Sequence, residues 1–201
     1  METRIRIAAG ILAAVLCPTA MAYETGDWIT RLGAHWVEPK NHNHDVVGVE
    51  GTGGITASAS YFVAPTLAVD LLVAFPFEHD ITLNSTDDKV ASTQHLPPTL
   101  SLVWYPDVAK TWHPFVGAGL NYTTFFQEKT QGALDGAKLK LDDSFGVAAV
   151  AGLDIDIAPP LSLSFDVRYI DIDAKAHLDG TSIGKVKIDP IGFGISVGYR
   201  F

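Results

Sequence analysis

The last ten residues of the chain, GFGISVGYRF (Gly192–Phe201), decide the fold. Every odd-numbered position is large and apolar, whereas the even-numbered positions are Gly or Ser, except for Arg200. A period of two is the pattern of a β-strand, because successive side chains point to opposite faces. The stretch therefore predicts a strand with one continuous apolar face and one face of small residues.

The same alternation recurs along the chain and is clear from Leu67 to Phe75, where odd positions are large and apolar. No segment shows a sustained helical period, and no second domain is indicated. Eight alternating segments are expected, at 27–38, 53–63, 67–81, 95–105, 113–126, 141–157, 161–174 and 186–201.

The connections between these segments alternate in length. The short ones are 64–66, 106–112 and 158–160, and the longer, polar ones lie near 39–52, 82–94, 127–140 and 175–185. Short turns at one rim and long loops at the other are typical of outer-membrane barrels, and an even strand number closes the sheet without an edge. We therefore expect an all-β fold, an eight-stranded antiparallel transmembrane β-barrel with short periplasmic turns and longer extracellular loops.

A soluble eight-stranded barrel of the lipocalin type is the alternative, and it would place the apolar face inside. The charged residues within the segments argue against it, because they lie opposite the apolar face: Asp70, Asp154, Asp166, Arg168 and Arg200. Aromatic residues near the segment ends suit two interfacial girdles. They are Trp28, Trp36, Phe77, Trp104, Tyr105, Phe125, Phe126, Tyr169, Tyr199 and Phe201.

Residues 1–22 have the pattern of a secretory signal peptide, with Arg4 and Arg6 before an apolar run and Ala20-Met21-Ala22 as the cleavage site. Residues 23–201 then form the barrel. Cys17 is the only cysteine; a lipoprotein site there is an alternative that its neighbours fit poorly. The exported chain is expected to have no disulfide and no cysteine-based metal site.

The formal net charge of −9 argues against nucleic acid as a partner. No G-x-S-x-G or equivalent constellation appears, so we expect neither an enzyme nor a cofactor. The sequence NHNHD (41–45) suits a polar loop better than a metal site, and Asp171 and Asp173 form a weak candidate for divalent cations at the outer rim. The remaining histidines are assigned to the rims: His35, His79, His95, His113 and His177.

Several long stretches resemble the OmpW family of outer-membrane proteins, which includes AlkL-like members. They are GDWITRLGAHWVEP (26–39), VDLLVAFPFEHDI (69–81), HLPPTLSLVWYP (95–106), HPFVGAGLNYTTFF (113–126), YIDIDAKA (169–176) and KIDPIGFGISVGYRF (187–201). The resemblance implies a narrow, largely apolar channel in Gram-negative outer membranes for passive uptake of small hydrophobic molecules. The partners expected are outer-membrane lipids, lipopolysaccharide, the solute and the barrel assembly machinery, around a monomer. The alternative is a non-transporting structural barrel whose loops bind a partner.

The parity of the strands points Leu72 and Val103 into the barrel, and Leu72 matches a position that the family links with an apolar constriction. Arg168 stands where an aromatic residue would be expected, and it can pair with Asp166 or Asp70 inside the barrel. These five residues are the predicted channel lining, and Arg168 argues against a purely apolar gate.

Four prolines, Pro76, Pro97, Pro98 and Pro190, lack the N–H that a ladder needs and fall towards the long-loop rim. Bulges or strand ends are one explanation. The other, which the resemblance favours, is a loosened wall between the third and fourth segments that releases a solute sideways into the membrane.

The terminal aromatic residues have a further expected role. Tyr199 and Phe201 resemble the C-terminal signal that the barrel assembly machinery recognises. They also suit an interfacial anchor at the periplasmic rim.

Overall fold

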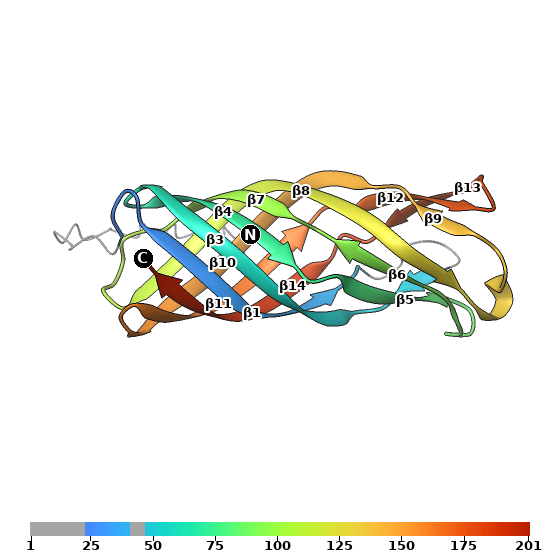
Figure 1. The fold of residues 1–201 in the computed structure, drawn as a ribbon, viewed down its shortest axis with the longest axis horizontal. Coiled ribbons are helices and arrows are strands. Elements are labelled where there is room, and N and C mark those ends of the chain that lie inside the picture. Colours follow the sequence, from blue (N-terminus) through green and yellow to red (C-terminus); the bar gives the residue numbers. More distant parts are fainter. Residues whose placement is uncertain (1–22, 41–46) are drawn as a thin grey trace, which may run out of the picture.

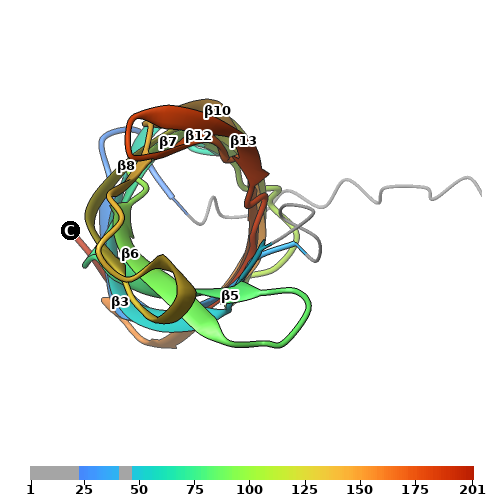
Figure 2. The same ribbon diagram turned by 90° about the vertical axis from the view of Figure 1, so that its right-hand side faces the viewer.

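The computed structural model describes residues 23–40 and 47–201, so the predicted signal peptide, Cys17 and all of NHNHD lie outside the described residues. Within the described part, eight antiparallel strands close into a ring in the order β10-β11-β14-β1-β3-β4-β7-β8, and β8 pairs back with β10. Figure 2 shows the ring end-on. The strands are β1 (Trp28–Glu38), β3 (Thr52–Ala64), β4 (Leu67–Ala74), β7 (Thr99–Trp104), β8 (Trp112–Thr130), β10 (Ser144–Ala158), β11 (Leu161–Ile170) and β14 (Ile191–Arg200).

The last strand closes the barrel against the first, since β14 pairs with β1 on one side and with β11 on the other. The end of the chain lies at the end of the barrel that carries the short connections, which we call the short-turn end (Figure 1). The predicted eight-stranded antiparallel barrel is therefore confirmed.

Six short strands extend the ring at the opposite end, the hairpin end (Figure 1). In the described residues these are β2 (Val47–Val49), β5 (Phe77–Leu83), β6 (Lys89–Leu96), β9 (Leu139–Leu141), β12 (Asp173–Leu178) and β13 (Thr181–Lys187), with a 3-10 turn, η1, at Gly132–Leu134. The connections expected at 82–94 and 175–185 are thus largely hairpins. The expected segments 67–81 and 95–105 are each divided in two, at Pro76 and at Pro97–Pro98, because proline interrupts a ladder.

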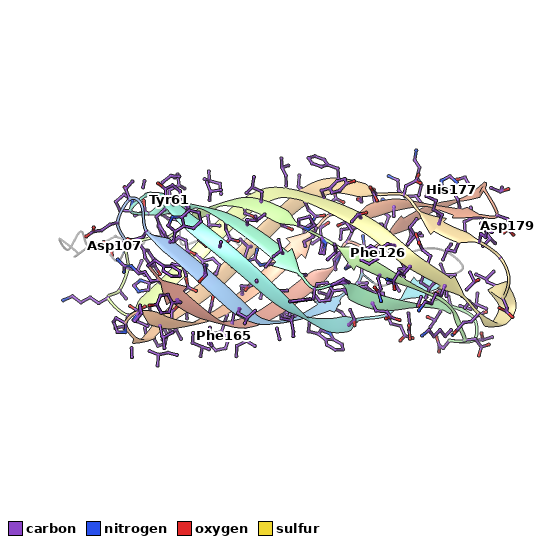
Figure 3. All side chains as sticks on the ribbon, in the orientation of Figure 1. Tyr61, Asp107, Phe126, Phe165, His177 and Asp179 are labelled. Carbon is purple, nitrogen blue, oxygen red and sulfur yellow. The ribbon has the colours of Figure 1, made fainter. Side chains whose placement is uncertain are left out.

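The outer face of the ring is an apolar band. Large hydrophobic side chains are exposed on every ring strand, as on β11, where Phe165 points away from the wall (Figure 3). His177 and Asp179 lie at the hairpin end, well away from Phe165 (Figure 3). On β5 the outward side chains are Glu78 and Asp80, with Leu83 half-buried at the end of the strand, so this strand lies beyond the apolar band. No helix in the described residues is long and apolar enough to cross a membrane.

Three of the aromatic residues assigned to the girdles lie inside the barrel instead. Phe77, Tyr105 and Phe125 are buried, whereas the four tryptophans are exposed. The sequence-based assignment followed position near a strand end, but the direction of a side chain follows strand parity. The girdle therefore consists of the outward-facing subset.

Candidate functional site in the barrel interior

A buried ion pair crosses the barrel in the half of the ring nearer the short-turn end. Arg31 on β1 and Asp154 on β10 are in contact through two atom pairs, Nε to Oδ1 at 3.3 Å and Nη2 to Oδ2 at 2.5 Å. The same guanidinium donates to Ser60 Oγ at 2.7 Å and to Tyr105 Oη at 3.0 Å. Because β1 and β10 are not neighbours in the ring, this contact spans the bore.

A second cluster joins the first through Asp70. Arg168 Nε donates to Asp166 Oδ2 at 2.9 Å, and its Nη2 lies 3.6 Å from Asp70 Oδ2. The other oxygen of Asp70 accepts from Ser60 and lies 3.9 Å from Arg31 Nη1. Arg168 therefore contacts both of the carboxylates named for it from the sequence. We call Arg31, Asp70, Asp154, Asp166 and Arg168 the charged network.

His35 on β1 completes this layer. Its Nε2 lies 3.0 Å from Asp166 Oδ2 and its Nδ1 lies 2.7 Å from Thr56 Oγ1. The close approach depends on Gly194, because a Cβ at that position would lie 2.2 Å from His35 Nε2. Sequence reasoning placed His35 at the rim and did not single out Arg31. Parity was the missed signal, since both alternate with the outward-facing Leu32 and Trp36.

Aromatic rings fill the barrel at its short-turn end. Tyr23 stacks on Phe62 with ring centroids 4.2 Å apart, and Tyr105 lies within 5.3 Å of Tyr23, Phe62 and Phe115. Val103 points inward, as parity predicts, but it packs into this cluster rather than facing open space. The voids at this level that the described residues enclose hold about 10 Å³ each, roughly one water molecule. We call this cluster the aromatic plug.

His113 belongs to the same end of the interior. It is buried, its ring lies 5.0 Å from that of Tyr23, and its Nε2 lies 3.1 Å from Asp156 Oδ2. The assignment of His35, His79, His95 and His113 to the rims was therefore wrong, because all four are buried inside the barrel. His177, by contrast, is partly exposed and contacts Asp142.

The hairpin end encloses an apolar cavity of about 300 Å³, which we call the outer cavity. This volume is typical of pockets for small molecules. Its described lining is hydrocarbon apart from His79, Thr93 and His95. The apolar side chains come from the extension strands, η1, the outer part of β8 and the residue after β13, among them Val49, Ile81, Phe125, Leu141, Val186 and Ile188.

A smaller cavity of about 30 Å³, the inner cavity, lies between the outer cavity and the charged network. It shares His95 with the first and Arg168 with the second. Leu72, Pro97 and Pro190 also line it. The structure therefore brings together one predicted lining residue of each kind, apolar and charged, and two of the four prolines.

The prolines differ in what they do to the wall. The ladder between the third and fourth long strands stops at Leu72–Thr99 and resumes at Phe77–His95, so residues 73–76 and 96–98 do not pair with each other. Pro76, Pro97 and Pro98 lie in this ladder gap. The wall between residues 96–98 and β8 is intact, because Pro98 O accepts a hydrogen bond from Tyr122 N at 3.1 Å.

Pro190 leaves the wall closed around it. Its carbonyl accepts from Ile170 N at 3.2 Å, and Lys40 N donates to Ile188 O at 2.9 Å. Its ring instead contributes to the inner cavity.

Three carboxylates gather at the base of the β12–β13 hairpin, Asp171, Asp173 and Asp189, with ligand atoms within 4.8 Å of one another. Burial and the neighbouring Asp189 raise the pKa of Asp171. Lys185 Nζ lies 2.9 Å from Asp173 Oδ2 and offsets part of this charge. All three carboxylates are half-buried.

Comparison with known proteins places this geometry in a family. The sequence model of the OmpW family matches residues 24–201. Outer membrane protein W of Escherichia coli K12 is 35% identical, with 98% of this chain and 99% of that protein covered. Outer membrane protein AlkL of Ectopseudomonas oleovorans is 27% identical, with 89% and 84% covered. The crystal structure of OprG from Pseudomonas aeruginosa superposes with a TM-score of 0.78 at 30% identity, with 91% and 99% covered.

Proposed function

This chain belongs to the OmpW family of outer-membrane β-barrel proteins, and on that premise we propose that it admits small hydrophobic molecules passively and releases them sideways into the outer membrane. The observation that carries it is that the apolar outer cavity meets, at His95, the inner cavity, which lies above the charged network and is lined by Ala74 and Pro97 of the ladder gap.

The proposed route enters at the hairpin end. An apolar solute gains free energy when it leaves water for the hydrocarbon lining of the outer cavity. The inner cavity, beside His95 and Leu72, is the next space along the axis. Its opening to a molecule larger than water requires the side chains around it to move.

The charged network makes the axial exit costly. Arg31, Asp154 and Asp70 are all buried, and separating such groups leaves uncompensated charge inside the barrel. The aromatic plug closes the bore beyond them. An apolar solute therefore meets a polar barrier below it and lipid beside it.

The ladder gap supplies the lateral exit in this proposal. Strand pairs elsewhere in the ring are held by backbone hydrogen bonds, and breaking these in lipid is expensive. Residues 73–76 and 96–98 do not pair with each other, and the prolines among them have no N–H to donate. The wall can therefore part here without breaking ladder hydrogen bonds. Val73 and Phe75 are exposed on the outer face, so the gap opens at the apolar band.

The test is uptake of an alkylbenzene by Gram-negative cells that express the protein in place of other uptake routes. Replacing Pro76 and Pro97 with Ala adds donors on the side of each strand that faces the gap, because Phe75 N and Pro98 O bond to the strands on the far sides, and we expect slower uptake than with the wild-type protein at equal surface levels. Replacing Pro190 is the matched control, because the wall around it is already bonded. Unchanged uptake in the Pro76 and Pro97 variant contradicts the lateral route.

The plugged short-turn end also suits the second candidate, a structural barrel whose hairpins bind a partner. That function requires no transfer of any apolar solute. Uptake no faster than in cells without the protein would favour it.

A further inference from the structure

Two buried histidines stand side by side in the wall of the outer cavity, which is hydrocarbon elsewhere except at Thr93. His79 on β5 and His95 on β6 are each 1% exposed, and their ring centroids lie 4.8 Å apart. His95 also lines the inner cavity, so the pair lies at the inner end of the outer cavity. Phe77 and Phe125 make T-shaped contacts with the His95 ring, with centroids 5.7 and 5.8 Å away, and pack against it.

The hydrogen bonds of these rings are incomplete. His79 Nδ1 lies 2.5 Å from the carbonyl oxygen of Glu50, which can only accept, so Nδ1 carries a proton. In the uncharged ring Nε2 is then a bare acceptor, and it has no hydrogen-bond partner among the described residues. His95 Nδ1 also has none. Unpaired buried polar atoms are costly and uncommon.

Both rings are uncharged near neutral pH. They lie beyond the apolar band, and burial lowers the pKa of His79. Burial and the neighbouring His79 lower the pKa of His95 to about 3. Charged groups near His79 are Glu38 and Asp80, and among the described residues no Asp, Glu, Lys or Arg lines the cavity. The site therefore suits a neutral ligand.

We propose that His79 and His95 bind the hydroxyl group of an otherwise apolar molecule, the class to which alkylphenols and alkanols belong. The ligand hydroxyl donates to His79 Nε2, and its oxygen accepts an N–H from His95. A ketone or an ether lacks the proton that His79 requires, and a hydrocarbon makes neither bond. This inference rests on the proposed function, since it names the solute class that the outer cavity prefers.

A metal ion fits the pair less well. Structural and catalytic sites for transition metals take three or four protein ligands. The carboxylate cluster at Asp171 is the only group of three or more ligating side chains found in the described residues, and none of its members lines the outer cavity.

The experiment compares 4-propylphenol with 4-propyltoluene, which differ by a hydroxyl in place of a methyl group. The full chain is placed in lipid nanodiscs, and binding is corrected with empty nanodiscs for partition into lipid. We expect the phenol to bind about three- to tenfold more tightly, the amount that one or two hydrogen bonds supply. Replacing His79 or His95 with Phe keeps an aromatic ring in the wall and should abolish the preference for the phenol. The affinity of each variant for 4-propyltoluene should stay within about twofold of that of the wild-type protein.

His177→Phe is the matched control, because His177 lies on β12 at the same end but does not line the cavity. The preference should persist in it. If the wild-type protein binds both probes equally, the inference fails and the proposed function stands. If neither probe binds above the empty nanodisc, both fail.

A second measurement needs no variant. In protein labelled with ¹⁵N at histidine, an Nε2 that begins to accept a hydrogen bond shifts its resonance upfield. We expect this shift for His79 on addition of 4-propylphenol and not of 4-propyltoluene. Identical spectra with the two probes overturn the proposal even if the His79 and His95 variants do not fold.

Discussion

Arg31 and Asp154 are bonded across the interior of the barrel although 123 residues separate them in the chain. Two strands, β11 and β14, lie between their own strands in the ring. The contact therefore ties opposite walls together and blocks the bore at the same time. The stability of the ring and the direction in which a solute leaves it are linked through this pair.

The first prediction concerns the energy of that contact. Arg31→Met leaves the buried Asp154 carboxylate without its cation, and Asp154→Asn leaves Arg31 with Asp70, at 3.9 Å, as its counter-charge; each should lower the free energy of unfolding by about 3–5 kcal/mol. The double variant should cost clearly less than the sum of the two. Urea unfolding in phospholipid, followed by tryptophan fluorescence, gives all four values. Additive costs would mean that the two side chains do not interact.

A second prediction tests the close contact around His35. In Gly194→Ala the new Cβ would meet His35 Nε2 at 2.2 Å and Asp166 Oδ1 at 2.8 Å, so the His35–Asp166 contact must break. We expect a loss of about 1–3 kcal/mol. Gly192→Ala is the control, because the nearest atom would lie 3.8 Å away, and it should change stability by less than about 0.5 kcal/mol. Equal losses in the two variants would contradict the geometry.

Stability should also fall in mild acid because of His95. Its pKa in the folded protein lies at about 3, below the ordinary value of 6.5, so the unfolded chain binds a proton more readily. The stability that this ring contributes is complete above pH 6.5 and is lost as the pH falls towards 3. Between about pH 7.5 and about pH 5 the wild-type protein should lose about 2 kcal/mol more than His95→Phe does. A parallel loss in both proteins would show that His95 is accessible to protons in the folded state.

The alternation of residues predicted the ring well, because in a membrane-spanning strand the side chains that face lipid must be apolar and those between them face inward. Leu71 and Val73 face outward and Asp70 and Leu72 face inward, as their alternation requires. Beyond the apolar band the outward side chains become polar and the inward ones apolar. Sorting aromatic and histidine residues by their distance from a strand end therefore failed there, as Phe77 and His79 show.

The Arg31–Asp154 contact could not be predicted from the sequence, whereas the contact of Arg168 with Asp70 across the bore was among the pairings expected. Which inward side chains meet at one height depends on the registers of several successive strand pairs, and alternation fixes none of these. Arg31 could have been recognised as inward-facing, but not as the partner of Asp154. The ladder gap could not be located from the sequence either. A proline predicts an interrupted strand, but it does not show which neighbouring strand loses its hydrogen bonds.

The role proposed for the C-terminal aromatic residues is open to a direct comparison. Phe201 is exposed, its ring lies 4.8 Å from that of Tyr199, and its backbone nitrogen donates to Trp28 O. Phe201→Ala should reduce the amount of barrel inserted in cells several-fold while changing the stability of refolded protein little. Phe193→Ala removes another exposed ring from the same end of the chain and should leave insertion unchanged. An equal fall of insertion and stability in Phe201→Ala would remove the support for an assembly signal.

The lateral exit itself is tested most directly by locking the ladder gap. The registers on either side place Ala74 opposite Pro97 or Pro98, and Ala74 and Pro97 both line the inner cavity. Residues 23–201 contain no cysteine, so Ala74→Cys combined with Pro97→Cys gives one reversible crosslink. Val69→Cys combined with Leu102→Cys, at partner positions in the intact ladder, is the control.

The measurement is the rate of alkylbenzene uptake by cells before and after reduction of the crosslink. The account predicts that the oxidised form of the Ala74→Cys, Pro97→Cys double variant takes up the solute several-fold more slowly than its reduced form, whereas the control variant shows no difference. Equal uptake in the oxidised and reduced states of the gap variant would contradict release through the wall.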